Sequence, residues 1–185
     1  EAAMEKKQTH PRAASLIESM RDLGYSLETA LADIIDNSIT AAAKNVDIHF
    51  EAGEKPFICI VDDGHGMSEQ ELFDAMRPGC ISPREQRTAN DLGRFGLGLK
   101  TASFSQCRQL TVVSKKNDKV SGARWDLDDV ISEDDWLLQI LNVEEIKATG
   151  WADYLKESGT VVLWENLDRL ADQTSGSNLK NHLYE

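Results

Sequence analysis

The sequence predicts an α/β fold in which a mixed β-sheet is covered on one face by helices. Segments with helical and strand-like patterns of apolar residues are mingled along the whole chain, without repeats or low-complexity tracts. The chain of 185 residues has the size of one ordinary domain, which buries about 70% of the surface of its unfolded chain. A mixed sheet with helices on one face is the economical way to bury both kinds of segment.

Helices are expected mainly in the first half of the chain. An amphipathic stretch runs from Ala13 to Leu23, and Ser26 can cap a longer helix from Leu27 to about Ala43. Ser68 can cap a short helix that reaches Met76. A glycine-rich segment further along the chain leads into another helix.

Short apolar runs bounded by turn residues predict the strands. These runs are Val46 to Phe50, Phe57 to Val61, Gln109 to Lys115, Val120 to Leu127, Leu137 to Val143 and Gly159 to Trp164. The polar, irregular segment from Arg77 to Leu92 resembles a mobile surface loop. The acidic S-E-D-D at Ser132 to Asp135 is expected to be a solvated turn rather than a site.

Charge and cysteine content argue against several classes of protein. The 20 Lys and Arg residues and 32 Asp and Glu residues give a net charge of −12. Such a surface repels polyphosphate backbones, so direct nucleic-acid binding by this domain is not expected, and a bound nucleotide would arrive with a cation. Cys59, Cys80 and Cys107 form no C-x-x-C pair, which predicts reduced thiols rather than disulfides or a zinc site.

Apolar runs such as Phe57 to Val61 are far shorter than the roughly 20 residues of a membrane helix. No signal-peptide pattern opens the chain. We therefore expect a soluble, cytoplasmic protein.

The stretch G-R-F-G-L-G-L-K-T-A, from Gly93 to Ala102, places three glycines within six positions directly before helix-forming residues. Glycine in a helix interior costs about 1 kcal/mol relative to alanine, so this cluster is typical of backbone that bends sharply or approaches something closely. The unpaired N–H groups and partial positive charge of a helix N-terminus favour an anion. The pattern indicates a phosphate site, with an ordinary glycine-rich loop as the alternative.

The stretch A-L-A-D-I-I-D-N-S-I lies on the helix expected from Leu27. At 3.6 residues per turn, one core-facing arc contains Leu27, Leu31, Ile34, Ile35 and Ser38. Asp33 and Asn37 lie together on the border of this arc, whereas Asp36 points to solvent. Asp33 can accept a proton from a water molecule, and the Asn37 carbonyl oxygen can ligate Mg²⁺. An amphipathic helix with polar residues on its outer edge is the alternative.

The stretch V-D-D-G-H-G-M, from Val61 to Met67, follows a buried strand. A carboxylate at the end of such a strand, with alternating glycines after it, suits the flat edge and face of a purine. Asp62 would accept a hydrogen bond from an exocyclic amino group, and Gly64 and Gly66 would let the ring lie against the backbone. The alternative is a glycine turn between a strand and a helix, and His65 is assigned no role.

These three motifs, D-x-x-x-N, D-x-G-x-G and G-x-x-G-x-G-L, follow one another in a single domain, which resembles the GHKL superfamily. That superfamily includes ATP-binding domains of gyrase-type topoisomerases, chaperones of the ninety-kilodalton class, sensor histidine kinases and MutL-type repair proteins. The resemblance covers about Leu23 to Trp164 and by eye is closer to the chaperone and MORC-like branches than to the kinases. It implies the Bergerat fold, a two-layer α/β sandwich with a mixed, largely antiparallel sheet and helices on one face.

The resemblance also implies roles for individual residues. Asn37 corresponds to the magnesium-binding asparagine, Asp62 to the aspartate that recognises the adenine amino group, and Thr160 to the threonine that shares a water with it. Met67 often lines the adenine pocket in relatives, and a core methionine is the competing interpretation. The phosphate-binding segment comprises Gly93, Arg94, Phe95, Gly96, Leu97, Gly98, Leu99 and Lys100. Lys100 would add charge near the phosphates or lie on the helix surface.

One position departs from the pattern of the hydrolysing branches. The residue four before the asparagine is usually a glutamate that orients the attacking water, and here it is Asp33. Aspartate has the same acid chemistry with one methylene fewer, and a misplacement of about 1 Å can cost on the order of 100-fold in rate. Slow ATP hydrolysis is therefore the first interpretation. A nucleotide-binding regulatory module with little or no hydrolysis is the alternative.

The resemblance also implies a domain organisation. Residues 1–11 would be an N-terminal extension or a remnant of expression, residues 12–166 the ATP-binding domain, and residues 167–185 a cap or the start of a linker to a missing domain. ATP and Mg²⁺ are the expected ligands. Closure of the segment from Arg77 to Leu92 over the nucleotide would drive conformational change or a nucleotide-dependent homodimer.

Overall fold

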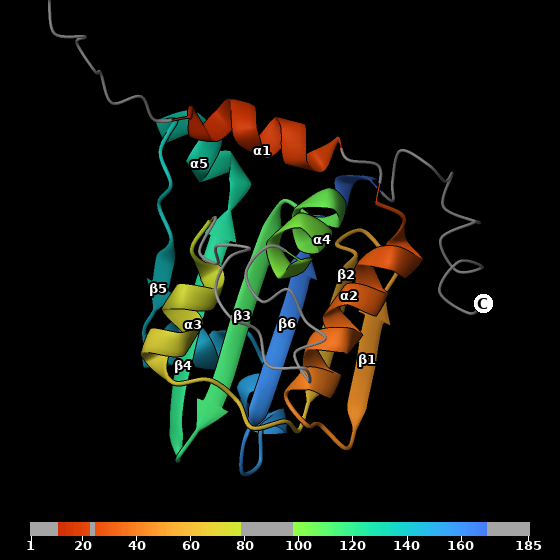
Figure 1. Ribbon diagram of the computed structural model, residues 1–185, viewed down its shortest axis with the longest axis vertical. Coiled ribbons are helices and arrows are strands. Elements are labelled where there is room, and N and C mark those ends of the chain that lie inside the picture. The colour runs from red at the N-terminus through yellow and green to blue at the C-terminus, as the bar shows by residue number, and fades with distance from the viewer. Residues whose placement is uncertain (1–10, 23–24, 79–97, 170–185) are drawn as a thin grey trace, which may run out of the picture.

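A six-stranded β-sheet forms the centre of the computed structural model, which describes residues 11–22, 25–78 and 98–169 (Figure 1). The strands are β1 (Val46–Glu51), β2 (Phe57–Asp62), β3 (Gln109–Lys116), β4 (Lys119–Asp126), β5 (Gln139–Leu141) and β6 (Gly159–Glu165). Their order across the sheet is β1-β2-β6-β3-β4-β5. Every pairing between these strands is antiparallel. This agrees with the largely antiparallel sheet that the family resemblance implies, but the expected mixed character is wrong for the described strands, because none of them pairs in parallel.

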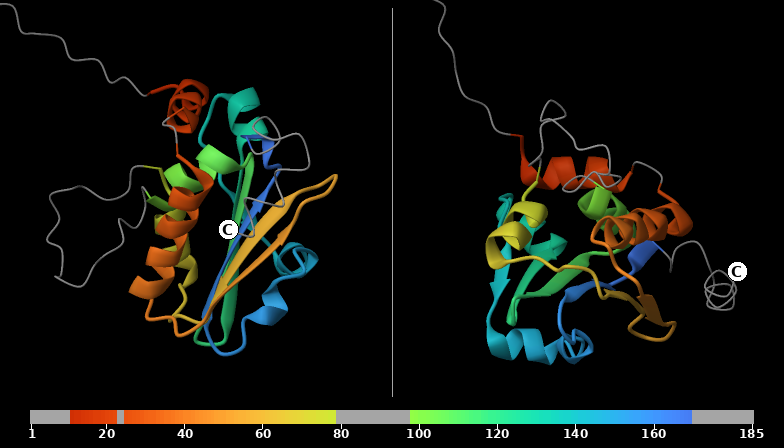
Figure 2. Two further views of the ribbon diagram at one scale, coloured as in Figure 1. Left: turned by 90° about the vertical axis from the view of Figure 1, so that its right-hand side faces the viewer. Right: turned by 60° about the horizontal axis from the view of Figure 1, so that its bottom comes forward.

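Helices lie on both faces of this sheet. They are α1 (Ala13–Arg21), α2 (Leu27–Thr40), α3 (Glu69–Met76), α4 (Gly98–Gln106), α5 (Leu127–Glu133), α6 (Val143–Ala148) and the short 3-10 helix η1 (Ala152–Tyr154). The helices α2, α3 and α4 cover one face, and α1 crosses the end of the molecule beside α5 (Figure 1). The left view of Figure 2 shows α6 and η1 on the opposite face. The expected helical layer is confirmed, and the second face is also partly covered.

Alternation along the central strands divides the apolar side chains between two cores. Ile58 and Ile60 of β2 belong to the larger core under α1 to α4, whereas Cys59 and Val61 belong to the smaller core on the other face. Ile146 of α6 packs into this smaller core. Because successive side chains of a strand point to opposite faces, the residue after Val61 returns to the face covered by α2.

Local signals in the sequence explain where α2 and α3 begin. The side chains of Ser26 and Ser68 accept hydrogen bonds from backbone N–H groups of the first turns, as expected for N-caps. The helix α2 ends at Thr40, before the expected end near Ala43, because Ala42 adopts a left-handed backbone conformation with φ of 58°.

In the described part of the second half, the α-helices α5 and α6 and the short helix η1 were not predicted from the sequence. Asp126 ends β4 and caps α5, so the strand expected to reach residue 127 stops one residue earlier. Asn142 caps α6, which shortens the strand expected at Leu137 to Val143 to Gln139–Leu141. The turn expected at Ser132 to Asp135 overlaps the end of α5.

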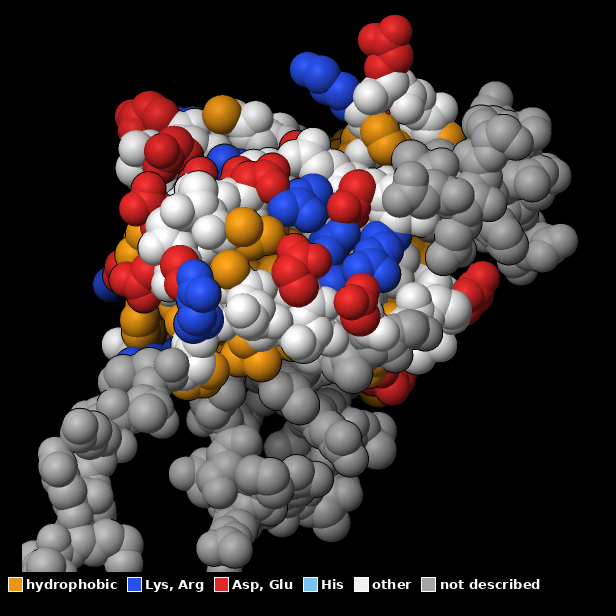
Figure 3. Space-filling view, turned by 90° about the horizontal axis from the view of Figure 1, so that it is seen from above, with side chains coloured by type: hydrophobic (Ala, Val, Ile, Leu, Met, Phe, Trp, Pro, Cys, Tyr) orange, Lys and Arg blue, Asp and Glu red, His pale blue; other side chains and the backbone are white. Residues whose placement is uncertain are grey.

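Ion pairs join α1, α5 and the segment after β6 at one end of the molecule. They are Arg12–Asp134 at 2.7 Å, Arg21–Asp168 at 2.6 Å and Arg169–Asp22 at 2.8 Å. Figure 3 looks onto this end and shows acidic and basic side chains interspersed on it. Acidic and basic side chains therefore do not form separate patches at this end of the molecule.

Two expectations from composition concern thiols and membranes. Cys59 and Cys107 are free and buried, and burial raises the pKa of Cys59 to about 12 and that of Cys107 further. Both thiols therefore stay protonated and unreactive near neutral pH, while Cys80 lies outside the described residues. Within the described ranges, no helix has the length and apolar character needed to cross a membrane.

Candidate functional site

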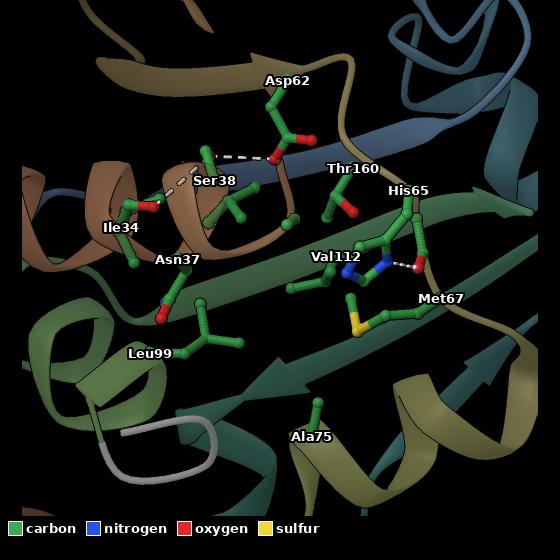
Figure 4. A pocket seen from close by; sticks show the side chains of 13 residues that line it. Ile34, Asn37, Ser38, Asp62, His65, Met67, Ala75, Leu99, Val112 and Thr160 are labelled. Carbon is green, nitrogen blue, oxygen red and sulfur yellow. Dashed lines mark hydrogen bonds between the residues drawn. The ribbon is translucent and has the colours of Figure 1, made fainter. Parts of the chain in front are cut away.

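A cavity lies between the helix-covered face of the sheet and α2, α3 and α4 (Figure 4). Its wall is mainly apolar with a few polar groups, as is usual for small-molecule sites. The lining residues are Ile34, Asn37, Ser38, Ala41, Asp62, His65, Gly66, Met67, Ala75, Leu99, Val112, Thr160 and Val162. Described residues from each of the three motifs, among them Asn37, Asp62 and Leu99, therefore line one cavity.

Strand register places three polar residues in one row on this face of the sheet. Asp62 of β2 is paired with Thr160 of β6, and Thr160 is paired with Ser114 of β3. Residues directly opposite one another on neighbouring strands project to the same face. All three are buried, so the row forms a polar floor within an otherwise apolar core.

Asp62 is held by two hydrogen bonds from different elements. The Ser38 hydroxyl of α2 donates to Oδ2 at 2.9 Å, and the backbone N–H of Gly64 donates to Oδ1 at 2.9 Å. Burial raises the pKa of Asp62, and these two hydrogen bonds oppose the increase. A carboxylate has about four acceptor sites, which is more than the protein donors around Asp62 occupy. Asp62 can therefore accept another hydrogen bond from a group inside the cavity.

Ser114 links three backbone and side-chain groups of the site by hydrogen bonds, and it was not predicted from the sequence. Its hydroxyl accepts from the backbone N–H of Met67 at 2.8 Å and contacts the carbonyl oxygen of Gly159 at 3.0 Å and Oγ1 of Thr160 at 2.9 Å. These contacts join the motif after β2 to the start of β6. Ser38 was placed on the core-facing arc, but its bond to Asp62 was not foreseen. In both cases the available signal was a serine at a position that otherwise requires an apolar side chain.

The glycines of the D-x-G-x-G motif are required by close backbone packing. A Cβ atom at Gly64 would lie 2.8 Å from both Cβ and the carbonyl oxygen of Ala41. Gly66 has φ of 66°, and a Cβ atom there would lie 2.9 Å from the carbonyl carbon of Lys115. Gly66 also lines the cavity, whereas Gly64 does not. Neighbouring protein atoms thus leave no room for a side chain at either position, which accounts for both glycines. Their contact with a purine stays a prediction.

Helix α2 presents the D-x-x-x-N motif near the start of α4. Asn37 lines the cavity, and Figure 4 shows its amide on the side of α4. Asp33 does not line the cavity, but its Oδ2 lies 3.9 Å from where a Cβ atom of Gly98 would be. Asp36 is exposed, as predicted. Asp33 and Asn37 therefore face the glycine end of α4 from one side of α2.

Helix α4 begins at Gly98, and Leu99 lines the cavity. Lys100 is 1% exposed, and its Nζ donates to the carbonyl oxygen of Ala75 at 2.7 Å. The alternative of a helix-surface lysine is therefore wrong, and contact with phosphates stays a prediction. The expected phosphate-binding residues Gly93, Arg94, Phe95, Gly96 and Leu97 lie outside the described residues, as does most of the segment from Arg77 to Leu92.

Met67 and His65 border the cavity next to the polar floor. Met67 lines it and also packs against the larger core, and contact of Met67 with adenine stays a prediction. His65 lines the cavity although it was assigned no role, and its Nδ1 lies 2.8 Å from the carbonyl oxygen of Gly66 (Figure 4). Among the described residues, no group of three or more His, Cys, Asp or Glu side chains could hold a metal ion. A cation here would need oxygen ligands from other sources.

Comparison with known proteins gives a family match over most of the chain. The family model described as histidine kinase-, DNA gyrase B- and HSP90-like ATPase matches residues 25–160. ATPase morc-1 of Caenorhabditis elegans is 32% identical over 90 residues, which cover 48% of this chain and 10% of that protein. The human MORC family CW-type zinc finger protein 1 is 31% identical over 96 residues, or 50% of this chain and 10% of that protein.

A mismatch repair protein shows a similar likeness. MutL of Koribacter versatilis is 31% identical over 98 residues, which cover 51% of this chain and 15% of that protein. The chain thus spans only 10% to 15% of the length of these relatives.

Proposed function

Because the chain belongs to the family of histidine kinase-, DNA gyrase B- and HSP90-like ATPases, we propose that its cavity binds ATP with Mg²⁺ and that the domain hydrolyses ATP slowly. The observation that carries this proposal is the buried carboxylate of Asp62, which lines an apolar cavity and retains acceptor capacity. An apolar slot with one oriented acceptor suits a flat base that carries an amino group. Thr160, beside Asp62 in the sheet, would share a water molecule with the same carboxylate.

The fit to adenine rests on the chemistry of the lining. Ile34, Val112, Val162 and Leu99 supply apolar surface for the faces of a ring, and Met67 adds an adaptable thioether. Asp62 is a hydrogen-bond acceptor when ionised, so it favours a base that presents a donor at that place. A base that presents a carbonyl oxygen there would leave two acceptors facing each other. The carboxylate therefore favours a base edge that presents an amino group, such as that of adenine.

The phosphates would extend from the cavity toward the N-terminus of α4. Backbone N–H groups from Gly93 to Lys100 would hold them, because a helix N-terminus has unpaired donors and partial positive charge. Asn37 would supply a protein oxygen ligand to Mg²⁺, which otherwise takes water and phosphate oxygens. When bound, the cation would neutralise charge that develops on the phosphate oxygens.

Asp33 is the proposed catalytic residue. Its carboxylate lies beside Gly98, the first residue of α4, and would orient or deprotonate the water that attacks the γ-phosphate. The shorter side chain of aspartate, in the place of the usual glutamate, would leave the water less well positioned and slow the reaction.

That same residue supports one alternative function. With Asp33 too short to position water, the domain would hold ATP and release little phosphate, so that nucleotide occupancy would regulate binding to a partner. Both proposals are compatible with a homodimer that forms when nucleotide is bound. Both are also compatible with a further domain in a longer protein. Closure of the segment from Arg77 to Leu92 over the nucleotide would accompany both.

A binding titration followed by phosphate release on the same sample tests both functions. ATP and a non-hydrolysable analogue are titrated with and without Mg²⁺, using the unaltered chain and Asp33→Asn. Slow hydrolysis requires that both proteins bind ATP, that Mg²⁺ strengthens binding, and that only the unaltered chain releases phosphate. Binding without detectable release in either protein would favour the regulatory module. Absence of ATP binding would refute both.

A further inference from the structure

The buried ammonium of Lys100 connects two helices that border the cavity. Lys100 lies in the first turn of α4, and its Nζ donates to the carbonyl oxygen of Ala75 in the last turn of α3 at 2.7 Å. Lys100 is 1% exposed. Such complete burial is rare for lysine and occurs where the charged group has a partner. The bond therefore joins the end of α3 to the beginning of α4 inside the protein.

The carbonyl groups at the end of α3 explain why a cation is suited to this place. The last carbonyl groups of a helix have no partner within the helix and carry partial negative charge. Lys100 satisfies the carbonyl of Ala75, and the indole Nε1 of Trp125 donates to the carbonyl of Met76 at 2.9 Å. These donors come from α4 and β4, so the end of α3 is held by two other elements.

This contact joins two parts of the cavity wall, although Lys100 itself does not line the cavity. Ala75 lines it from α3, and Leu99, the neighbour of Lys100, lines it from α4. We propose that Lys100 is a positioning residue that sets the separation of Ala75 and Leu99, and thereby the width of the slot that receives the base. It acts on the shape of the cavity and not through a contact with phosphate.

The two roles of Lys100 make different predictions for ligands. A phosphate ligand affects ATP and leaves adenosine unaffected, because adenosine has no phosphate. A residue that sets the width of the slot affects both ligands to the same extent. The ratio of ATP affinity to adenosine affinity therefore separates the two roles, and this part of the inference rests on the proposed function.

The experiment compares Lys100→Met with the unaltered chain. Methionine keeps an unbranched apolar stem but cannot donate to Ala75, and Lys119→Met removes an exposed lysine as the matched control. Global stability is not informative here, because replacing a buried charge by an apolar group can be neutral or stabilising. The measurements are the affinities for adenosine and ATP and, without nucleotide, hydrogen exchange of the amides from Leu72 to Met76.

A positioning role predicts that K100M weakens adenosine and ATP by the same factor, about tenfold, the usual effect of losing a charged hydrogen bond. Amides at the end of α3 should exchange about tenfold faster, and K119M should change neither quantity. Lys100→Arg, which keeps a cationic donor, should restore part of the slow exchange.

Loss of ATP affinity with unchanged adenosine affinity would overturn the inference, as would unchanged exchange in α3. Should K100M fail to fold, Lys100→Gln permits the same comparison of ligands, because its shorter amide removes the charge. If the unaltered chain binds neither ligand, the proposed function fails. Exchange in α3 without nucleotide then decides the role of Lys100 by itself, with faster exchange in the variant supporting it and unchanged exchange refuting it.

Discussion

Replacing Gly66 by alanine tests whether the D-x-G-x-G motif is fixed by packing of the protein itself. Gly66 has φ of 66°, and a left-handed conformation costs an alanine about 1–2 kcal/mol. The added Cβ would lie within contact distance of the Lys115 carbonyl group, 2.9 Å from its carbon and 3.2 Å from the carbonyl oxygen of Gly159. These are backbone atoms of paired strands and cannot rotate away. Overpacking of this kind costs roughly 1–3 kcal/mol, so the total loss for Gly66→Ala is about 2–5 kcal/mol.

Two other glycines separate these contributions. Gly150 has φ of 77° but nothing within 4 Å of a Cβ atom, so Gly150→Ala carries only the backbone cost of about 1–2 kcal/mol. Gly53 has no left-handed conformation, and its nearest neighbour would be Oε1 of Glu51 at 3.5 Å. Gly53→Ala should therefore be neutral or stabilise the fold by up to about 1 kcal/mol.

Urea denaturation of the three variants measures these differences in the free energy of unfolding. We expect Gly66→Ala to be the least stable by at least about 1 kcal/mol, followed by Gly150→Ala and then Gly53→Ala. If Gly66→Ala unfolds at the same urea concentration as Gly150→Ala, the contact of the added Cβ with the backbone of Lys115 and Gly159 does not lower stability. The glycine would then need another explanation, such as the approach of a ligand.

Two further predictions concern pH. The raised pKa of Asp62 means that its carboxylate becomes protonated at a higher pH than an ordinary aspartate, so ATP affinity should fall on acidification already above the usual aspartate range. A titration of affinity against pH would contradict this if the decrease began only at or below that range. Lys116 and the N-cap Ser68 lower the pKa of Glu71 from 4.5 to about 2. The stability from ionised Glu71 is complete above pH 4.5 and is lost toward pH 2, so Glu71→Gln should flatten this part of the acid unfolding curve, and an unchanged curve would refute the assignment.

Features that depend on neighbouring residues could be predicted from the sequence. Ser26 and Ser68 cap the helices expected after them, because capping involves only the next few residues. Asp62 ends an apolar run that forms β2, and Asp33 and Asn37 share one side of α2 because of the helical period. The cap of α6 also had a local signal in Asn142 and Glu145, but the apolar run before it favoured a longer strand.

Features that depend on distant pairing could not be predicted in this way. The hydroxyl of Ser114 meets Thr160 only through the register of β3 and β6, whose partners are separated by 46 residues. Lys100 finds its acceptor on Ala75, which is 25 residues away on another helix. A single sequence specifies that such polar groups need partners when buried, but not which partners the fold brings to them.

The affinity for ATP of Asp62→Asn, compared with that of Asp63→Asn, tests the central claim most directly. Asp62 lines the cavity, whereas the exposed carboxylate of the neighbouring Asp63 accepts hydrogen bonds from the backbone of Lys44 and Asn45. Losing a hydrogen bond to a charged acceptor costs about 1.5–3 kcal/mol, or roughly 10- to 150-fold in affinity. We predict a loss of this size for Asp62→Asn and less than about twofold for Asp63→Asn. Equal affinities of Asp62→Asn and the unaltered chain would contradict the assignment of the cavity as the adenine site.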